Sequence, residues 1–290
     1  MGVEILNGNS FELIKTLPDD SIDCVVTSPP YFGLRDYNNE NQYGLENTPN
    51  EYVEKMVLLF RDIHRVLRGS GTAWLNLGDT YANVSARAGA LNGIQKGNVG
   101  TYNWNKDREY KKVLDVKPKN ILGIPWRVAF ALQGDGWYLR QDIIWARPNP
   151  MPESVKDRCT KSHEYIFLLC KNPDYYFDLE SIKEPCEYEV KRHKRSVWSV
   201  AVRPFAGAHF ATFPTALIEP CILAGCPEGG TVLDPFFGSG TTGVVCQSLG
   251  RNCIGFELNP TYIEIAKNRL AGFESKDELK ASRIGYEDWI

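Results

Sequence analysis

Apolar positions in this chain form two kinds of pattern: short continuous runs, and longer stretches with helical spacing. The short runs predict buried strands at residues 3–6, 22–26, 72–77, 137–145, 165–170, 232–233 and 253–256. The longer stretches predict helices at residues 11–17 (capped by Ser10), 51–67, 120–132, 215–223, 241–249 and 260–270. Strands that alternate with helices are typical of a mostly parallel sheet covered on both faces. We therefore expect a doubly wound α/β fold.

Three polar stretches interrupt this alternation and predict long loops. They span residues 32–49, 82–118 and 179–208. Loops of this length in a compact domain are usually functional or disordered. The expected fold is therefore one large domain with loop insertions, for which 290 residues with a hydrophobic content of 43% are sufficient.

Composition argues against several classes of protein. The chain has no run of about 18 apolar residues, so we expect no membrane span. Its first residues lack the pattern of a secretory signal, which favours a cytoplasmic location. Eight cysteines are scattered without CxxC pairs, and the four histidines do not cluster with them. This favours reduced core cysteines and no metal site.

Charge is distributed unevenly along the chain. The net charge of −3 argues against a generally basic, nucleic-acid-binding surface. Two local segments are nevertheless basic, one within residues 106–119 and one at residues 191–195. Such patches are compatible with DNA contact through one face of the molecule. Each segment taken alone is equally compatible with solvated surface charge.

A glycine-rich turn near the end of the chain indicates a nucleotide site. Residues 230–243 read GTVLDPFFGSGTTG, in which a short strand ends at Asp234 and the glycines open a helix. Glycines let a ligand approach the backbone, and helix N-termini favour polar or anionic groups. The next strand ends at Glu257, 23 positions after Asp234, where a carboxylate can bind ribose hydroxyls. This order predicts an adenosine-containing cofactor.

The position of this turn also constrains the topology. Only 47 residues follow Gly243, too few for the rest of a doubly wound sheet. The remaining strands must therefore come from earlier in the chain, in a circularly permuted order. No lysine follows the glycines, so the turn is not a P-loop.

A second motif follows the predicted strand at residues 22–26. It reads SPPY and comprises Ser28, Pro29, Pro30 and Tyr31. A loop at the carboxyl end of a parallel strand is where ligands bind in open α/β sheets. Prolines offer carbonyl groups without competing N–H groups, the serine adds a hydroxyl acceptor, and the tyrosine adds a flat face. We therefore interpret this turn as a candidate catalytic loop.

Together, SPPY after an apolar strand and DPFFGSGTT downstream resemble the amino-methyltransferase family of DNA-modifying enzymes. The order of the two motifs resembles the family's beta group, and the resemblance covers most of the chain. It implies the S-adenosylmethionine-dependent methyltransferase fold, S-adenosylmethionine as cofactor and double-stranded DNA as substrate. SPPY is associated in this family with cytosine N4, whereas an Asp in the first position is commoner in adenine-N6 enzymes.

The resemblance also implies roles for individual residues. Ser28, Pro29, Pro30 and Tyr31 are the implied catalytic residues. The implied cofactor contacts are Asn9, Phe213, Asp234, Phe236, Gly238, Ser239, Gly240, Thr241, Thr242 and Glu257. Asn9 departs from the Asp that the family pattern leads us to expect, although Asn can also hydrogen-bond an adenine edge.

The implied chemistry suits these residue types. If Ser28 and the Pro29 carbonyl accept the two hydrogens of an exocyclic amine, its lone pair is drawn out of the ring and toward the methyl donor. Positioning of this kind can contribute ~7–11 kcal/mol in principle. The target base must leave the duplex, and Tyr31 is placed to stack on it, for ~1–3 kcal/mol. Asp79 is expected either to orient the base or to cap a turn, and Asn149 either to face the DNA or to form a structural turn.

DNA contacts are expected from two regions. Arg35 follows the SPPY turn closely, and the basic run Lys191, Arg192, Lys194 and Arg195 lies where this group usually carries its target-recognition region. The expected organisation is a catalytic half (1–178, with insertion 82–118 sharing DNA binding), a short recognition segment (179–208) and a cofactor half (209–290).

Several alternatives remain open at this point. An adenine-N6 DNA methyltransferase is the nearest, and related PPY loops also serve methyltransferases acting on RNA or on protein glutamine. A nicotinamide-dependent oxidoreductase would use the glycine turn alone, and a non-enzymatic DNA-binding module would not explain both motifs. A C5-cytosine enzyme is disfavoured because Ser28 stands where its nucleophilic cysteine should. A cognate restriction endonuclease is a possible partner, and the protein is expected to be a monomer or homodimer.

Overall fold

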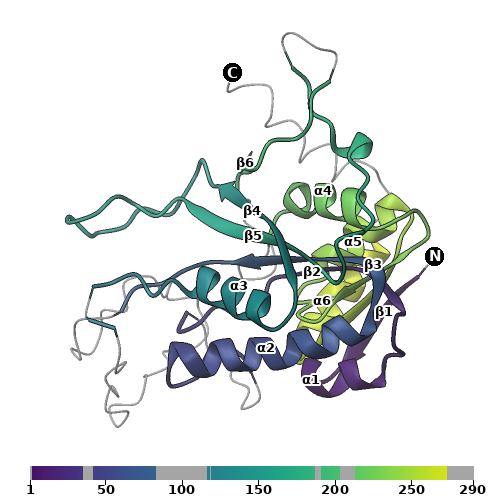
Figure 1. The fold of residues 1–290 in the computed structure, drawn as a ribbon, viewed down its shortest axis with the longest axis horizontal. Coiled ribbons are helices and arrows are strands. Elements are labelled where there is room, and N and C mark those ends of the chain that lie inside the picture. The colour runs from purple at the N-terminus through teal and green to yellow at the C-terminus, as the bar shows by residue number, and fades with distance from the viewer. Residues whose placement is uncertain are drawn as a thin grey trace.

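One mixed, eight-stranded sheet organises the molecule (Figure 1). The computed structural model describes residues 2–34, 42–82, 116–117, 119–186, 191–202 and 213–272. The order of strands across the sheet is β1-β8-β7-β2-β3-β5-β4-β6. The strands are β1 (Val3–Asn7), β2 (Ile22–Thr27), β3 (Leu67–Leu77), β4 (Tyr138–Ala146), β5 (His163–Cys170), β6 (Val197–Ser199), β7 (Thr231–Asp234) and β8 (Asn252–Glu257).

Most neighbouring strands are parallel, as predicted, but β5 runs antiparallel to both β3 and β4. The direction has a simple cause in the connection between β4 and β5. Residues 147–162 contain no helix, and the chain returns directly into the adjacent strand, which a parallel crossover does not allow. The start of β5 therefore lies at the same edge of the sheet as the carboxyl ends of β2 and β3.

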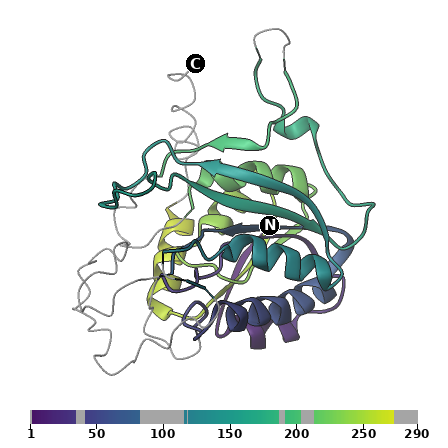
Figure 2. The same ribbon diagram turned by 60° about the vertical axis from the view of Figure 1, so that its left-hand side comes forward.

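Helices cover both faces of the sheet, which confirms the doubly wound architecture (Figures 1 and 2). One face is covered by α1 (Ser10–Leu13), η1 (Ile14–Thr16), α2 (Pro49–Val66) and α3 (Ile124–Gly134), and the other by α4 (Thr215–Gly225), α5 (Thr241–Leu249) and α6 (Pro260–Ala271). A short 3-10 turn, η2 (Glu180–Ile182), precedes β6. Successive residues of β2 alternate between the cores, with Val25 on the α2 side and Cys24 and Val26 on the α4 side.

Two local expectations were wrong. The first helix is capped by Asn9, whose side chain accepts a hydrogen bond from the Phe11 N–H at 2.8 Å, rather than by Ser10. The Ser10 hydroxyl instead donates to the Pro235 carbonyl at 2.5 Å, and the helix continues only as a 3-10 turn. The loop expected at residues 179–208 contains strand β6, which is only three residues long.

Among the described helices, none has the length and hydrophobicity needed to cross a bilayer. All eight cysteines are free, and six are buried, in keeping with their expected place in the core. Cys159 is exposed and Cys186 is half-buried. The described part of the chain contains no group of three potential metal ligands.

Candidate active site

The two sequence motifs meet at one edge of the sheet. Strands β2 and β7 are parallel neighbours, with Val25 opposite Leu233, so the turns that follow them leave the sheet side by side. The Thr27 hydroxyl at the end of β2 donates to Asp234 Oδ1 at the end of β7, over 2.8 Å. The predicted proximity of the serine-proline turn and the glycine turn is therefore confirmed.

Asp234 joins three elements at this junction. Its carboxylate also accepts hydrogen bonds from the Phe236 N–H (3.1 Å) and from the Thr242 hydroxyl in α5 (2.6 Å). The side chain is buried, and this burial raises its pKa to about 6 in spite of the three donors. Asp234 thus fixes the shape of the glycine turn through bonds within the protein.

The glycine turn is open on one side and tightly packed on the other. Gly238 and Gly240 have φ angles of 53° and 83°, which favour glycine. A Cβ atom on Gly240 would lie 2.8 Å from the Ala266 Cβ, so this glycine allows α6 to approach. A Cβ atom on Gly238 would meet nothing closer than the Phe236 carbonyl at 4.0 Å. A ligand can therefore approach the backbone at Gly238.

Arg269 of α6 holds the far side of this turn. One guanidinium nitrogen donates to the Ser239 carbonyl (2.8 Å), the Ser239 hydroxyl (2.9 Å) and the Thr241 hydroxyl (3.1 Å). Ser239 and Thr241 are buried, and no described side chain caps the N-terminus of α5. The hydroxyls of Ser239 and Thr241 thus stabilise the turn, while the N-terminus of α5 keeps its attraction for polar groups.

Glu257 ends β8 beside the glycine turn. Its two carboxylate oxygens accept the Gly238 N–H (2.8 Å) and the Asn259 N–H (2.7 Å). Burial raises the pKa of Glu257. Each carboxylate oxygen has further lone pairs, so the group can also accept hydroxyl hydrogens of a ribose. This carboxylate and the open side of Gly238 fit an adenosine-containing cofactor.

The remaining predicted cofactor residues have different environments around this turn. Phe236 is half-buried and meets Tyr43 edge-on, with ring centroids 5.1 Å apart. Asn9 follows β1, next to β8, and its Oδ1 caps α1. Phe213 is half-buried and packs against the core on the α4 side. The neighbouring residues 209–212 lie outside the described residues.

The serine-proline turn is held from α2. The Pro30 carbonyl accepts a hydrogen bond from the Tyr52 hydroxyl at 3.1 Å. The Pro29 carbonyl, in contrast, receives no hydrogen bond from any residue in the described ranges. The Tyr31 ring lies on Gly78, where an added Cβ atom would come within 2.5 Å of the Tyr31 Cε2. The bond from Tyr52 and the packing of Tyr31 on Gly78 thus fix the shape of the turn.

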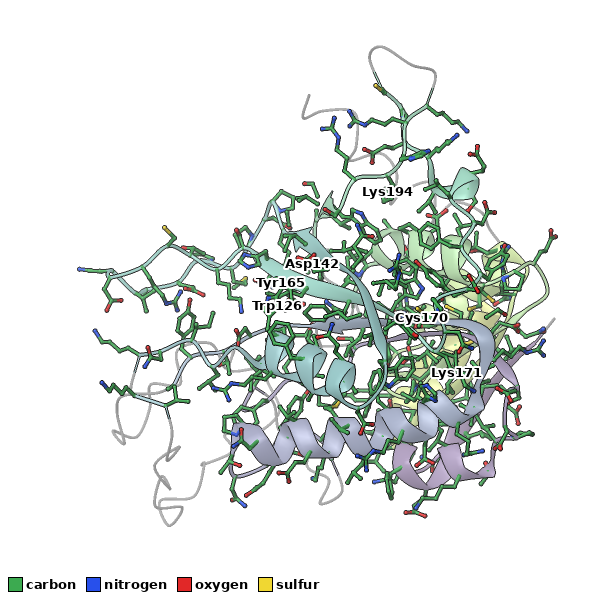
Figure 3. The ribbon with its side chains drawn as sticks, in the orientation of Figure 1. Trp126, Asp142, Tyr165, Cys170, Lys171 and Lys194 are labelled. Atoms are coloured by element: carbon green, nitrogen blue, oxygen red, sulfur yellow. The ribbon has the colours of Figure 1, made fainter. Side chains whose placement is uncertain are left out.

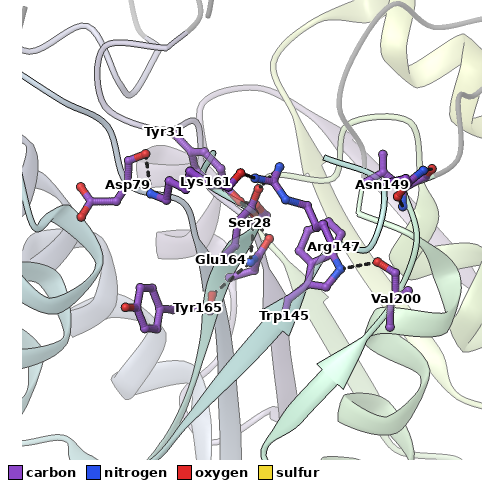
Figure 4. Close-up of polar contacts among 12 residues, drawn as sticks. Ser28, Tyr31, Asp79, Trp145, Arg147, Asn149, Lys161, Glu164, Tyr165 and Val200 are labelled. Carbon is purple, nitrogen blue, oxygen red and sulfur yellow. Dashed lines mark hydrogen bonds and ion pairs between the residues drawn. The ribbon is translucent and has the colours of Figure 1, made fainter. Parts of the chain in front are cut away.

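A polar cluster beneath this turn was missed by sequence reasoning (Figure 4). The Tyr31 hydroxyl lies 2.5 Å from Glu164 Oε2 and 2.9 Å from Asn76 Oδ1, and accepts from the Ser28 hydroxyl at 3.4 Å. Arg147 forms an ion pair with Glu164 Oε1 at 3.0 Å. We call Ser28, Tyr31, Asn76, Arg147 and Glu164 the Tyr31 cluster. The available signal was a polar residue inside each of two buried strands, Asn76 in β3 and Glu164 in β5.

Asp79 and Asn149 have structural roles in this geometry. Asp79 accepts the N–H groups of Gly123 (3.1 Å) and Ile124 (3.0 Å), and so caps the start of α3. Asn149 forms two hydrogen bonds with the backbone of Val202. Its side-chain amide donates to the Val202 carbonyl (2.8 Å), and its Oδ1 accepts from the Val202 N–H (3.0 Å). These contacts match the structural alternative expected for each residue, a cap for Asp79 and a turn for Asn149.

The basic run is divided between two environments. We call the segment that contains it, residues 183–196 without 187–190, the basic arm; it projects from the body beside β6 (Figure 1). Arg192 and Lys194 form ion pairs with Glu184, at 3.0 and 3.8 Å, and the Lys194 side chain is largely buried. Lys194 lies at the base of the arm (Figure 3). Lys191 and Arg195 are exposed. Arg35, the other predicted DNA contact, lies outside the described residues.

Comparison with known proteins identifies the family. A family model described as DNA methylase matches residues 22–268. The chain is 51% identical over 269 residues to the type II methyltransferase M.SmaI of Serratia marcescens, covering 92% of this chain and 90% of that protein. It is 49% identical over 271 residues to M.Cfr9I of Citrobacter freundii, covering 93% and 88%.

Solved structures agree with this assignment at the level of the fold. The cytosine-N4-specific PvuII DNA methyltransferase superimposes with a TM-score of 0.70 at 20% identity, covering 98% of this chain and 91% of that one. The Thermus thermophilus protein TTHA0409, in its complex with S-adenosylmethionine, gives 0.62 at 21% identity, covering 95% and 97%. The predicted methyltransferase fold is thereby confirmed. The family model and the two type II relatives show that the chain belongs to the DNA methylase family, which unites N6 and N4 methyltransferases.

Proposed function

We propose that this enzyme transfers a methyl group from S-adenosylmethionine to the exocyclic N4 of cytosine in a flipped-out base of double-stranded DNA. The observation that supports it best is the junction of β2 and β7, where Thr27, directly before Ser28 and Pro29, is hydrogen-bonded to Asp234, directly before the glycine turn. The Ser28 hydroxyl and the Pro29 carbonyl, as two acceptors for an amine, would then lie beside a site that fits an adenosine-containing cofactor.

The cofactor assignment is supported by the fit of this chain's own residues. Glu257 has lone pairs for ribose hydroxyls, and the backbone at Gly238 is open to a ligand. The TTHA0409 structure contains S-adenosylmethionine on the same fold. When bound, S-adenosylmethionine supplies an electrophilic methyl group on a sulfonium. We expect this chain to bind S-adenosylmethionine but not a nicotinamide dinucleotide.

The protein's contribution to the reaction is positional. An aromatic amine is a weak nucleophile because its lone pair is delocalised into the ring. Ser28 and the Pro29 carbonyl would accept its two hydrogens, which holds the nitrogen lone pair toward the methyl donor. Part of the half-buried Tyr31 ring packs on Gly78. The part of the ring that Gly78 does not cover would contact the extruded base. No covalent intermediate on the protein is required.

The choice of cytosine N4 is supported by the serine in the first position of SPPY. The PvuII enzyme that shares the fold is described as cytosine-N4-specific. The experiment is incubation of mixed-sequence duplex DNA with methyl-labelled cofactor, followed by digestion to nucleosides. We expect the label in N4-methylcytosine. Label in N6-methyladenine alone would contradict the choice of base, while leaving the family assignment intact.

The division of labour along the chain is part of the proposal. Residues 1–178 would provide the catalytic turn, 179–208 the target recognition and 209–290 the cofactor site. Two of the relatives are named type II methyltransferases, which supports a cognate restriction endonuclease acting on the same DNA site as a partner.

Removal of the two exposed cations of the basic arm should weaken DNA binding. Lys191→Ala with Arg195→Ala is expected to reduce the slope of log affinity against log salt concentration by about 2, because each phosphate contact contributes about 0.9. The measurement is DNA affinity across a salt series. Lys15→Ala with Lys267→Ala is the matched control, since it removes two exposed charges from η1 and α6. Equal slopes for the basic-arm variant and the control would contradict a DNA contact by this arm.

A further inference from the structure

Glu164 carries a carboxylate that is buried, where a charged group loses its hydration. It is only 8% exposed, near the start of β5, and its ion pair with Arg147 lies mostly out of water. Desolvation of a buried ion pair often cancels its Coulombic attraction, so such a pair adds little to stability. Its position within the Tyr31 cluster suggests a different contribution, namely control of hydrogen-bond direction.

The direction of the hydrogen bond between Tyr31 and Glu164 follows from which of the two groups carries a hydrogen. Glu164 is ion-paired with Arg147 at 3.0 Å, and the carboxylate of an ion pair can only accept hydrogen bonds. The Tyr31 hydroxyl must therefore donate its one hydrogen to Glu164, 2.5 Å away. Burial, and then the negative charge of Glu164, raise the pKa of Tyr31 well above its ordinary value, so the phenol retains that hydrogen.

Asn76 reinforces the same direction. Its amide nitrogen donates to the Tyr165 carbonyl (3.0 Å) and lies 3.4 Å from Glu164 Oε2. These contacts orient the side chain so that its oxygen, another acceptor, faces Tyr31 at 2.9 Å. Two acceptors thus face the Tyr31 hydroxyl, and its one hydrogen is held on their side by Glu164, so toward Ser28 it can only accept, over 3.4 Å.

We propose that Glu164 is a positioning residue: through Tyr31 it directs the Ser28 O–H away from the substrate, so that the Ser28 lone pairs face the target amine. This inference rests on the proposed methyl transfer to an exocyclic amine. A freely rotating serine could donate to the amine nitrogen and occupy the lone pair needed for attack. A serine whose hydrogen is already donated to Tyr31 can only accept the amine's hydrogens.

The test is the pair Glu164→Gln and Tyr31→Phe, singly and together. Glutamine has nearly the same shape but can donate, and Arg147 will hold its oxygen, so its amide hydrogens point at Tyr31. We expect each single variant to lower kcat about tenfold or more, with KM for DNA and for S-adenosylmethionine changed less than about twofold. The double variant should lose no more than the worse single variant, because both act on one hydrogen-bond chain.

Glu153→Gln is the matched control, because Glu153 forms an ion pair with Arg158 in the β4–β5 connection and does not contact Tyr31. It should retain the wild-type kcat. Full activity of Tyr31→Phe, additive losses in the double variant, or losses confined to KM would each overturn the inference. Tyr31→Phe decides the matter if Glu164→Gln does not fold. A wild type without DNA methylation would instead refute the proposed function, and with it this inference, whereas an active wild type matched by Glu164→Gln overturns the inference alone.

Discussion

Replacing Ser28 by alanine should lower kcat for methyl transfer about 10²- to 10³-fold, the usual effect of removing one preorganised hydrogen-bonding group from an active site. The Ser28 hydroxyl is half-buried at the carboxyl end of β2, and its hydrogen is donated to Tyr31. Its loss leaves the Pro29 carbonyl without the second acceptor that the proposal assigns to the amine. Single-turnover incorporation of labelled methyl groups into duplex DNA measures the effect.

Ser21→Ala is the matched control for this experiment. Ser21 precedes β2 at the opposite edge of the sheet, and its hydroxyl donates to the Pro18 carbonyl at 2.7 Å. The two serines thus occupy the two ends of one strand, and only Ser28 adjoins the glycine turn. We expect Ser21→Ala to retain wild-type kcat with a small loss of stability, about 1 kcal/mol. A Ser28→Ala variant as active as Ser21→Ala would refute the catalytic role of the turn.

Gly238→Ala should weaken S-adenosylmethionine binding by about tenfold or more, because the new methyl group would occupy the side of the turn from which the ligand approaches. No described atom lies closer than 4.0 Å to that position, so the change creates no clash within the protein. The left-handed backbone, with φ of 53°, should cost about 1–2 kcal/mol in the free energy of unfolding. Calorimetric titration and urea unfolding measure the two effects separately.

Gly229→Ala separates backbone strain from ligand exclusion. Gly229 has φ of 73° in the turn before β7, and an added Cβ atom would meet no described atom within 4 Å. Its substitution should cost as much stability as Gly238→Ala while leaving S-adenosylmethionine affinity unchanged. If the two variants bind S-adenosylmethionine equally well, the proposed approach of the cofactor at Gly238 is wrong.

The junction of the two motifs could be predicted from the sequence because it depends only on recognising two parallel strands and the residues that follow them. Asp234 and Ser28 each follow a short apolar run, and the carboxyl ends of parallel strands share one edge of a sheet. The helices were also predictable, since α5 begins at Thr241 directly after the glycines and ends at Leu249 before Gly250. The boundaries of a helix depend on local signals such as these flanking glycines, which can be read directly from the sequence.

Glu164 escaped prediction because its location depends on strand direction. A residue at the start of a parallel strand lies at the edge opposite the active site. β5 is antiparallel, so its first residues lie beside the ends of β2 and β3, where Tyr31 is found. Apolar spacing identifies a strand but not its direction, which here results from a helix-free connection. The pairing of Arg192 with Glu184 was hidden for a similar reason, since it depends on an isolated bridge between two loop segments.

The permuted strand order has a consequence for synthesis of the protein in the cell. Strands β1 and β2 are consecutive in the chain, yet β8 and β7 lie between them, and Val3 pairs with Cys253. A nascent polypeptide that has left the ribosome only as far as β6 therefore has its serine-proline turn but a gap two strands wide where the glycine turn belongs. Closure of that gap pairs β1 with β8, about 250 residues apart in sequence, and is among the most non-local events in folding. A chain that lacks β7 and β8 also lacks Asp234, the glycine turn and Glu257, so we expect it to be unable to bind S-adenosylmethionine.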